Sequence, residues 1–193
     1  MRQGIPDVII LRGAPGVGKS TLAKALAKHF PQGVRLEVDT LRSMVISVDW
    51  TNQQEHKDLL QVAAQLTRQF LGLGFKPVLV IDTFSGDKVQ PFLDAVNGTE
   101  ADLQVKVFAL HASLEVLVER LLARPEDQFR NLAVTKKLNS DVLKIRRPTD
   151  VLLDTSKKSA QELARAVLAS VHAISEQADG GNDNAPRGDP FHD

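Results

Sequence analysis

Residues 8–20 read VIILRGAPGVGKS and decide the fold. The first four form a short apolar run rich in β-branched residues, which is typical of a strand buried on both faces of a parallel sheet. Glycine and proline follow at once, and apolar residues then recur at every fourth position from Leu22 to Phe30, which indicates one face of a helix. The stretch therefore predicts a strand, a glycine-rich loop and a helix in succession.

The loop between this strand and this helix matches G-x-x-x-x-G-K-[ST] at residues 13–20. Its glycines let successive backbone N–H groups turn inward around a phosphate, and the helix adds the positive end of its dipole. We expect Lys19 to reach the β- and γ-phosphates of ATP, and Ser20 to bind Mg²⁺. The predicted nucleotide-binding residues of this loop are Gly13, Ala14, Pro15, Gly16, Val17, Gly18, Lys19, Ser20 and Thr21.

Strand-like and helix-like patterns alternate along the rest of the chain. Further strands are predicted at 34–38, 78–81, 105–110 and 151–153, and further helices at about 52–71, 89–96, 114–121 and 163–174. This alternation implies parallel strands joined by right-handed crossovers, with ligands at the carboxyl ends of the strands. We predict an α/β, three-layer P-loop NTPase fold with a five-stranded parallel sheet, as one domain over residues 1–176. The polar segment 177–193 is expected to be a flexible tail.

Composition limits the classes of function. Lys plus Arg equals Asp plus Glu at 24 each, so no overall charge draws the chain to nucleic acid or to an anionic membrane. The absence of cysteine excludes disulfides and cysteine-based zinc sites. No apolar run is long enough to span a bilayer, and the start of the chain has no apolar segment like that of a signal peptide. We expect a cytoplasmic protein with no membrane partner.

The residues after the third predicted strand separate the classes of nucleotide-binding protein. Asp82 is followed by Thr-Phe-Ser, so the D-x-x-G of a GTPase is missing, and N-K-x-D does not occur either. A hydrolytic ATPase usually follows this magnesium-linked Asp with a Glu that orients water, whereas Thr83 stands here. Unguided water competes poorly for the γ-phosphoryl group, which favours transfer to an acceptor hydroxyl. A dinucleotide-binding loop is disfavoured, because Thr21 occupies the position of the last glycine of G-x-G-x-x-G.

A transferase needs a base for the acceptor hydroxyl and positive charge near the moving phosphoryl group. Asp39 follows the second predicted strand, and we expect it to be the base; the alternative is an N-cap of a helix at 41–47. Arg120 and Arg124 share one helix face at the entrance to segment 124–147, which carries seven Lys or Arg against three acidic residues. We predict a basic lid that closes over ATP, the alternative being a solvated helix face.

Together these residues resemble the polynucleotide 5′-hydroxyl kinase family in the phosphate loop and in the motifs Asp39-x-x-Arg42, Asp82-Thr83 and Arg120-x-x-x-Arg124. The likeness covers about residues 7–175. It implies that Asp39 is the general base, that Arg42 binds the phosphate of the accepting nucleotide and that Arg124 contacts the donor phosphates. It also implies that Asp82 orients the loop or the water around the metal.

The chain departs from that family where it would meet the acceptor. Thr40 stands where the family has a second Asp, and Phe84 stands where it has Asn. Zeta-type toxins, chloramphenicol phosphotransferases and gluconate kinases resemble the chain as well, so a small-molecule acceptor stays open beside a polynucleotide or nucleotide 5′-hydroxyl. A nucleotide-gated binding module without an acceptor is an alternative from another class. Trp50 and His56 are expected to pack within the fold rather than to form the site.

Overall fold

The computed structural model of the chain describes residues 4–98, 103–126 and 128–179. Within these residues five parallel strands form a sheet in the order β2-β3-β1-β4-β5. The predicted five-stranded parallel sheet is therefore confirmed. The strands are β1 (Val8–Gly13), β2 (Val34–Glu37), β3 (Val78–Asp82), β4 (Val105–His111) and β5 (Val151–Asp154).

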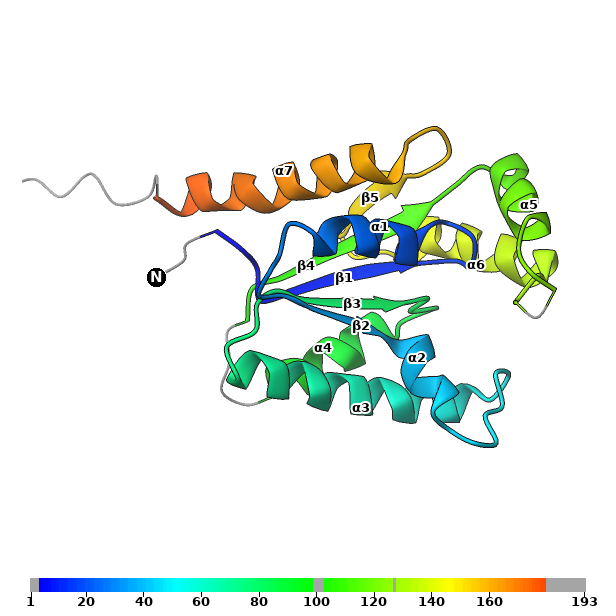
Figure 1. Ribbon diagram of the computed structural model, residues 1–193, viewed down its shortest axis with the longest axis horizontal. Coiled ribbons are helices and arrows are strands. Elements are labelled where there is room, and N and C mark those ends of the chain that lie inside the picture. Colours follow the sequence, from blue (N-terminus) through cyan, green and yellow to red (C-terminus); the bar gives the residue numbers. More distant parts are fainter. Residues whose placement is uncertain (1–3, 99–102, 127, 180–193) are drawn as a thin grey trace, which may run out of the picture.

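Helices cover both faces of the sheet, as the three-layer prediction requires. Figure 1 shows α1 and α7 on one face, α3 and α4 on the other, and α2, α5 and α6 near the carboxyl ends of the strands. The helices are α1 (Lys19–Ala27), α2 (Val38–Ser43), α3 (Gln53–Gly72), α4 (Val89–Asn97), α5 (Leu114–Leu122), α6 (Leu132–Lys144) and α7 (Ala160–Asp179).

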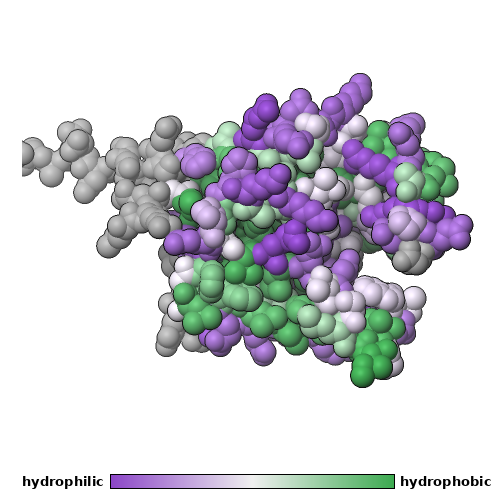
Figure 2. Space-filling model, viewed as in Figure 1, coloured by the Kyte–Doolittle hydropathy of each residue, from purple (hydrophilic) through white to green (hydrophobic). Residues whose placement is uncertain are grey.

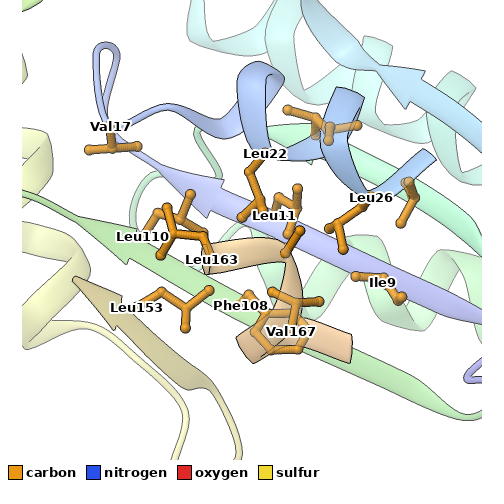
Figure 3. Close-up of a cluster of buried hydrophobic side chains, with 14 of the residues drawn as sticks. Ile9, Leu11, Val17, Leu22, Leu26, Phe108, Leu110, Leu153, Leu163 and Val167 are labelled. Atoms are coloured by element: carbon orange, nitrogen blue, oxygen red, sulfur yellow. The ribbon is translucent and has the colours of Figure 1, made fainter. Parts of the chain in front are cut away.

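Strand β1 is buried on both faces, and alternate side chains enter two different apolar clusters. Ile9 and Leu11 pack with α1 and α7 (Figure 3), whereas Val8 and Ile10 pack with α3 and α4. Each fully buried aliphatic side chain contributes about 1.5–3 kcal/mol relative to an exposed one. The central strand is thus firmly held, and with it the start of the loop at residues 13–18. The first cluster also contains Val17, Leu22, Leu26, Phe108, Leu110, Leu153, Leu163 and Val167.

The second strand is shorter than predicted. β2 ends at Glu37 and α2 begins at Val38, so Asp39 lies in the first turn of a helix rather than at the tip of a strand. Glu37 occupies the N-cap position of α2 and makes no side-chain capping bond. The alternative role of Asp39 as an N-cap is therefore wrong, because the helix starts before it.

The segment predicted as a basic lid contains a helix, α6. Asn131 caps this helix by accepting a hydrogen bond from the N–H of Val134 at 3.0 Å. Only Thr135 and Val142 of α6 are fully buried, so the helix lacks a broad apolar stripe and its period is weak in the sequence. At its middle, Asn139 exchanges hydrogen bonds with the backbone of Ala112 at 2.8 and 3.2 Å, which ties the segment to the end of β4.

The last helix extends beyond the predicted end of the domain at residue 176, since α7 continues to Asp179. The rest of the predicted tail, residues 180–193, lies outside the described residues. Across residues 4–98, 103–126 and 128–179, none of the helices combines the length and the apolar character needed to cross a bilayer.

Candidate active site

The glycine-rich loop joins β1 to α1 at the carboxyl edge of the sheet. Gly13, Gly16 and Gly18 have φ values of 148°, 86° and 95°, in the region that favours glycine. Gly18 is the N-cap of α1 and no side chain caps this end of the helix. The first N–H groups of α1 therefore point out of the helix without a side-chain acceptor, an arrangement suited to binding an anion.

The ammonium group of Lys19 lies against the inside of this loop. Its Nζ donates to the carbonyl oxygens of Gly13 at 2.7 Å and Ala14 at 3.2 Å. Burial lowers the pKa of Lys19, while the negative charges of Asp82 and Asp39 act in the opposite direction. Lys19 thus stands between the phosphate loop and two carboxylates that come from β3 and α2. Its contact with the β- and γ-phosphates stays a prediction.

A carboxylate that the sequence did not single out meets Ser20. The Ser20 hydroxyl donates to Oε2 of Glu37 at 2.9 Å, and Ser20 is exposed. Glu37 is the last residue of β2, so its place at the carboxyl end of a strand was the signal that could have identified it. A hydroxyl and a carboxylate oxygen side by side suit Mg²⁺, which usually takes one or two protein ligands together with phosphate and water oxygens. The residues present therefore fit a magnesium ion.

Asp39 lies in the first turn of α2 with its side chain open to solvent. Partial removal of the carboxyl group from water raises the pKa of Asp39 most, and the negative charge of Asp82 raises it further. The positive charge of Lys19 lowers it. A raised pKa makes the carboxylate a better proton acceptor, although solvent contact weakens the shift. Exposure and basicity are both properties that a general base requires.

Asp82, at the end of β3, is buried and held by a chain of hydrogen bonds. Its two carboxylate oxygens lie 3.1 and 3.2 Å from Nε2 of His56, and the N–H of Phe84 donates to Oδ2 at 2.7 Å. On the other side of the imidazole ring, Nζ of Lys88 lies 3.0 Å from Nδ1. Because an ammonium group can only donate, Nδ1 of His56 accepts and Nε2–H donates to Asp82.

This chain of hydrogen bonds keeps Asp82 ionised. Burial by itself raises the pKa of Asp82, but the hydrogen bonds from His56 and from the Phe84 N–H outweigh burial and lower the pKa. Asp82 is only 3% exposed, so its predicted contacts with metal and substrate stay predictions. His56 packs within the fold as expected, yet it also fixes a carboxylate of the site, which the sequence reasoning missed.

The turn after β3 is held in a strained conformation. Phe84 has φ of 44°, a left-handed value that costs a non-glycine residue about 1–3 kcal/mol. Its N–H binds Asp82, and its carbonyl oxygen accepts from the guanidinium of Arg12 at 3.0 Å. Arg12 is buried and also forms an ion pair with Asp150 at 3.5 Å, just before β5. Backbone strain held by buried charges in this way is common near functional sites.

Arg42 is buried rather than open to the site. It is 6% exposed, its guanidinium donates to the carbonyl oxygen of Asp49 at 3.2 Å, and it lies 3.9 Å from a carboxylate oxygen of Glu55. The guanidinium also stacks on the ring of Trp50, 4.6 Å from its centroid. The predicted contact of Arg42 with an acceptor phosphate stays a prediction, and these internal contacts count against it. Arg42 is also not an ordinary surface charge, because its side chain is buried.

Arg120 and Arg124, at the entrance to the lid segment, differ in their surroundings. Arg120 donates to the carbonyl oxygen of Gly16 at 3.4 Å and to the side chain and carbonyl of Thr155 at 3.1 and 2.7 Å. It therefore ties the phosphate loop to the turn after β5. Arg124 donates to Phe129 at 3.1 Å, burial lowers its pKa, and its charge acts on both Asp39 and Lys19. Arg124 thus belongs electrostatically to the same group as the loop lysine.

A family model described as an AAA domain matches residues 8–148, well over half of the chain. The chain belongs to the AAA domain family. The matched region runs from β1 to the end of the lid and so contains the phosphate loop, α2, the end of β3, Arg120 and Arg124. No match to the chain was found among curated proteins.

Solved structures share the fold of this AAA domain protein. A gluconokinase from Sinorhizobium meliloti is 19% identical with a TM-score of 0.65, over 93% of this chain and 99% of that one. An APS kinase from Mycobacterium tuberculosis in complex with AMPPNP and APS is 17% identical with a TM-score of 0.61, over 86% and 96%. The Pnkp1/Rnl/Hen1 RNA repair complex contains a chain that is 24% identical with a TM-score of 0.59, over 74% and 45%. At these identities the likeness establishes a kinase-like P-loop fold.

Proposed function

We propose that this AAA domain protein transfers the γ-phosphoryl group of ATP to the hydroxyl group of an acceptor. One observation carries the proposal: Lys19, bonded to carbonyl oxygens of the phosphate loop, lies within electrostatic reach of an exposed carboxylate, Asp39, and of Arg124. A base, a phosphate-binding cation and a second cation that can approach the moving group are the parts that phosphoryl transfer needs.

In the proposed reaction Asp39 accepts the proton of the acceptor hydroxyl as its oxygen attacks the γ-phosphorus of ATP. The bond between the γ-phosphorus and the bridging oxygen breaks, and ADP leaves with that oxygen. Lys19 and Arg124 stabilise the negative charge on the moving group. Ser20 and Glu37 would hold Mg²⁺, which supplies further positive charge to the phosphate oxygens.

A small-molecule alcohol is the acceptor that the geometry supports best. Arg42 is the residue that favours a polynucleotide acceptor within the resemblance, yet its guanidinium is occupied by Asp49, Glu55 and Trp50. A polynucleotide or nucleotide 5′-hydroxyl is the second candidate. The exposed cations of the lid, such as Arg130, favour it because they could attract a phosphate backbone.

Transfer of radiolabelled γ-phosphate tests the proposal. Purified protein, ATP and Mg²⁺ are incubated with a panel of neutral alcohols, polyols and oligonucleotides with 5′-hydroxyl ends, and labelled products are separated. We expect at least one acceptor to be labelled, and Asp39→Asn to lower kcat by a factor of about 10²–10⁴ while ATP affinity is retained. Asp94→Asn is the matched control, since Asp94 is an exposed aspartate on α4 whose amide replacement keeps the acceptor oxygen for Gln90.

Two outcomes would contradict the proposal. Equal transfer by Asp39→Asn and Asp94→Asn would remove Asp39 as the base. Hydrolysis of ATP without labelling of any acceptor, together with a protein partner retained only in the ATP-bound state, would instead favour a nucleotide-gated binding module. Lys19→Met should abolish ATP binding under either reading.

A further inference from the structure

The segment between α2 and α3 exposes apolar side chains beside the candidate site. Met44 is 69% exposed, Ile46 is fully exposed and Trp50 is 50% exposed. Figure 2 shows this segment as a hydrophobic projection at the end of the molecule, separated by a hollow from the part built by α5 and α6. Exposed apolar side chains gathered in one segment beside a hollow are typical of a ligand-binding surface rather than of a solvated loop.

Trp50 is an ordered platform and not a loose surface residue. The guanidinium of Arg42 lies 4.6 Å from the centroid of its ring, and Arg42 is itself fixed by the carbonyl of Asp49 and by Glu55. A buried cation against the ring and a half-exposed side chain mean that part of the indole surface remains open. Stacking of a ligand there therefore costs the Trp50 side chain little additional conformational entropy.

The platform lies next to the proposed base. Arg42 follows Asp39 by three positions in α2, so the two side chains share one face of the helix. The charge of Arg42 also acts on the Asp39 carboxylate and lowers its pKa. The Trp50 ring therefore lies over a residue that is about one helical turn from Asp39 in α2. A molecule stacked on Trp50 is in a position to offer a hydroxyl group to Asp39.

The charges around the platform select the kind of ligand. Between residues 38 and 54, all of which the structure describes, Arg42 is the only Lys, Arg or His, and it is buried. Carboxylates of Glu37, Asp39, Asp49 and Glu55 surround this segment instead. Within residues 38–54 a negatively charged group on the acceptor would meet carboxylates and no exposed cation, which disfavours an acid at the Trp50 ring.

We infer that Trp50, with Met44 and Ile46 beside it, forms the acceptor subsite, and that it takes a neutral alcohol bearing an aromatic ring system. A nucleoside and an alcohol with another aromatic group share this chemistry. The inference rests on the proposed function, because it identifies the acceptor whose hydroxyl group gives its proton to Asp39 and receives the γ-phosphoryl group. The subsite binds the aromatic part of the acceptor, which does not react.

Trp50 is the only tryptophan of the chain, so its fluorescence reports on the subsite directly. The parent protein without ATP is titrated with adenosine, 2-phenylethanol, glycerol and gluconate. We expect a saturable change in Trp50 emission with adenosine or with 2-phenylethanol and none with glycerol or gluconate. A change with adenosine alone would indicate a nucleoside acceptor, and a change with 2-phenylethanol alone would indicate another aromatic alcohol. Asp39→Asn should show the same change, because stacking does not require the base.

Kinetics then test the role in transfer. Trp50→Ala should raise KM for the aromatic acceptor about tenfold with a smaller effect on kcat, and Trp50→Phe should restore most of the loss. Leu73→Ala is the matched control, since Leu73 is 72% exposed at the far end of α3, and it should leave KM unchanged.

The results distinguish failure of the inference from failure of the proposed function. Saturable Trp50 emission changes without any labelled product would keep the subsite and overturn phosphoryl transfer. Labelling of glycerol or gluconate, with no emission change for aromatic probes and the same KM in Trp50→Ala, would keep phosphoryl transfer and overturn the subsite.

Discussion

Alanine at position 13 would collide with the backbone of β4. Gly13 has φ of 148°, and a Cβ there would lie 2.5 Å from the carbonyl oxygen of Leu110 and 3.0 Å from Cγ2 of Val17. The first contact cannot be relieved by turning a side chain, because Gly13 pairs with Leu110 in the sheet. Overpacking costs about 1–3 kcal/mol, and an unfavourable backbone conformation about 1–3 kcal/mol more. We expect Gly13→Ala to lower the free energy of unfolding by about 3 kcal/mol.

Urea and thermal unfolding followed by circular dichroism measure this effect. In a chain of this size a loss of about 3 kcal/mol corresponds to a decrease in Tm of roughly 6–12 °C. Gly72→Ala is the matched control, because Gly72 ends α3 and a Cβ there meets nothing within 4 Å. We expect this control to be unchanged or to gain up to about 1 kcal/mol. If the Gly13 and Gly72 variants were equally stable, the reasoning that the loop is packed against β4 would be refuted.

Three further predictions concern the site. The acid limb of the pH–rate profile should have its midpoint above 3.8, the usual value for aspartate, because the pKa of Asp39 is raised and activity is lost when the base is protonated; a midpoint at or below 3.8 would exclude Asp39. His56→Ala should lower the free energy of unfolding by about 3 kcal/mol near neutral pH, since it leaves the buried Asp82 charge with only the Phe84 N–H as a donor. Because the folded-state pKa of Asp82 lies below 3.8, the stabilisation by ionised Asp82 is complete above that pH and fades as the pH falls through the lower, folded-state pKa. Urea unfolding at several pH values checks the effect of His56→Ala and this pH dependence. A loss of less than about 1 kcal/mol in His56→Ala would count against the chain of hydrogen bonds. Glu37→Gln keeps an acceptor for Ser20 but removes a charge, so the Mg²⁺ concentration for half-maximal transfer should rise about tenfold, and an unchanged requirement would separate Glu37 from the metal.

The core and the phosphate loop could be predicted from local patterns. The run Val8 to Leu11 is buried on both faces as its apolar residues indicated, and each predicted strand lies in the sheet. The loop at residues 13–20 joins a strand to a helix as the motif requires. These features depend on residues that are neighbours in the sequence, so that composition and periodicity are enough to reveal them.

The boundaries and surroundings of single site residues were harder to predict. The pattern from Val34 to Val38 alternates as a strand does, yet α2 begins at Val38, because tertiary packing against α3 and β3 overrides strand propensity there. The lid helix α6 was missed for a related reason. Its contacts with β4 and α5 are narrow, and hydrogen bonds of Asn139 contribute where an apolar stripe is lacking.

From the sequence alone follow the five strands and the helices α1, α3, α4, α5 and α7, the phosphate loop with Lys19 and Ser20, and the presence of carboxylates near the ends of strands. Only the tertiary structure decided which of those groups meet. It brings Glu37 to Ser20, brings His56 from α3 to Asp82, and buries Arg42 beneath Trp50. The physical reason is that such contacts join different elements of the fold. Whether a charged side chain ends in solvent or in a pair depends on which elements pack beside it, and that is set by the sheet order and not by the spacing of residues along the chain.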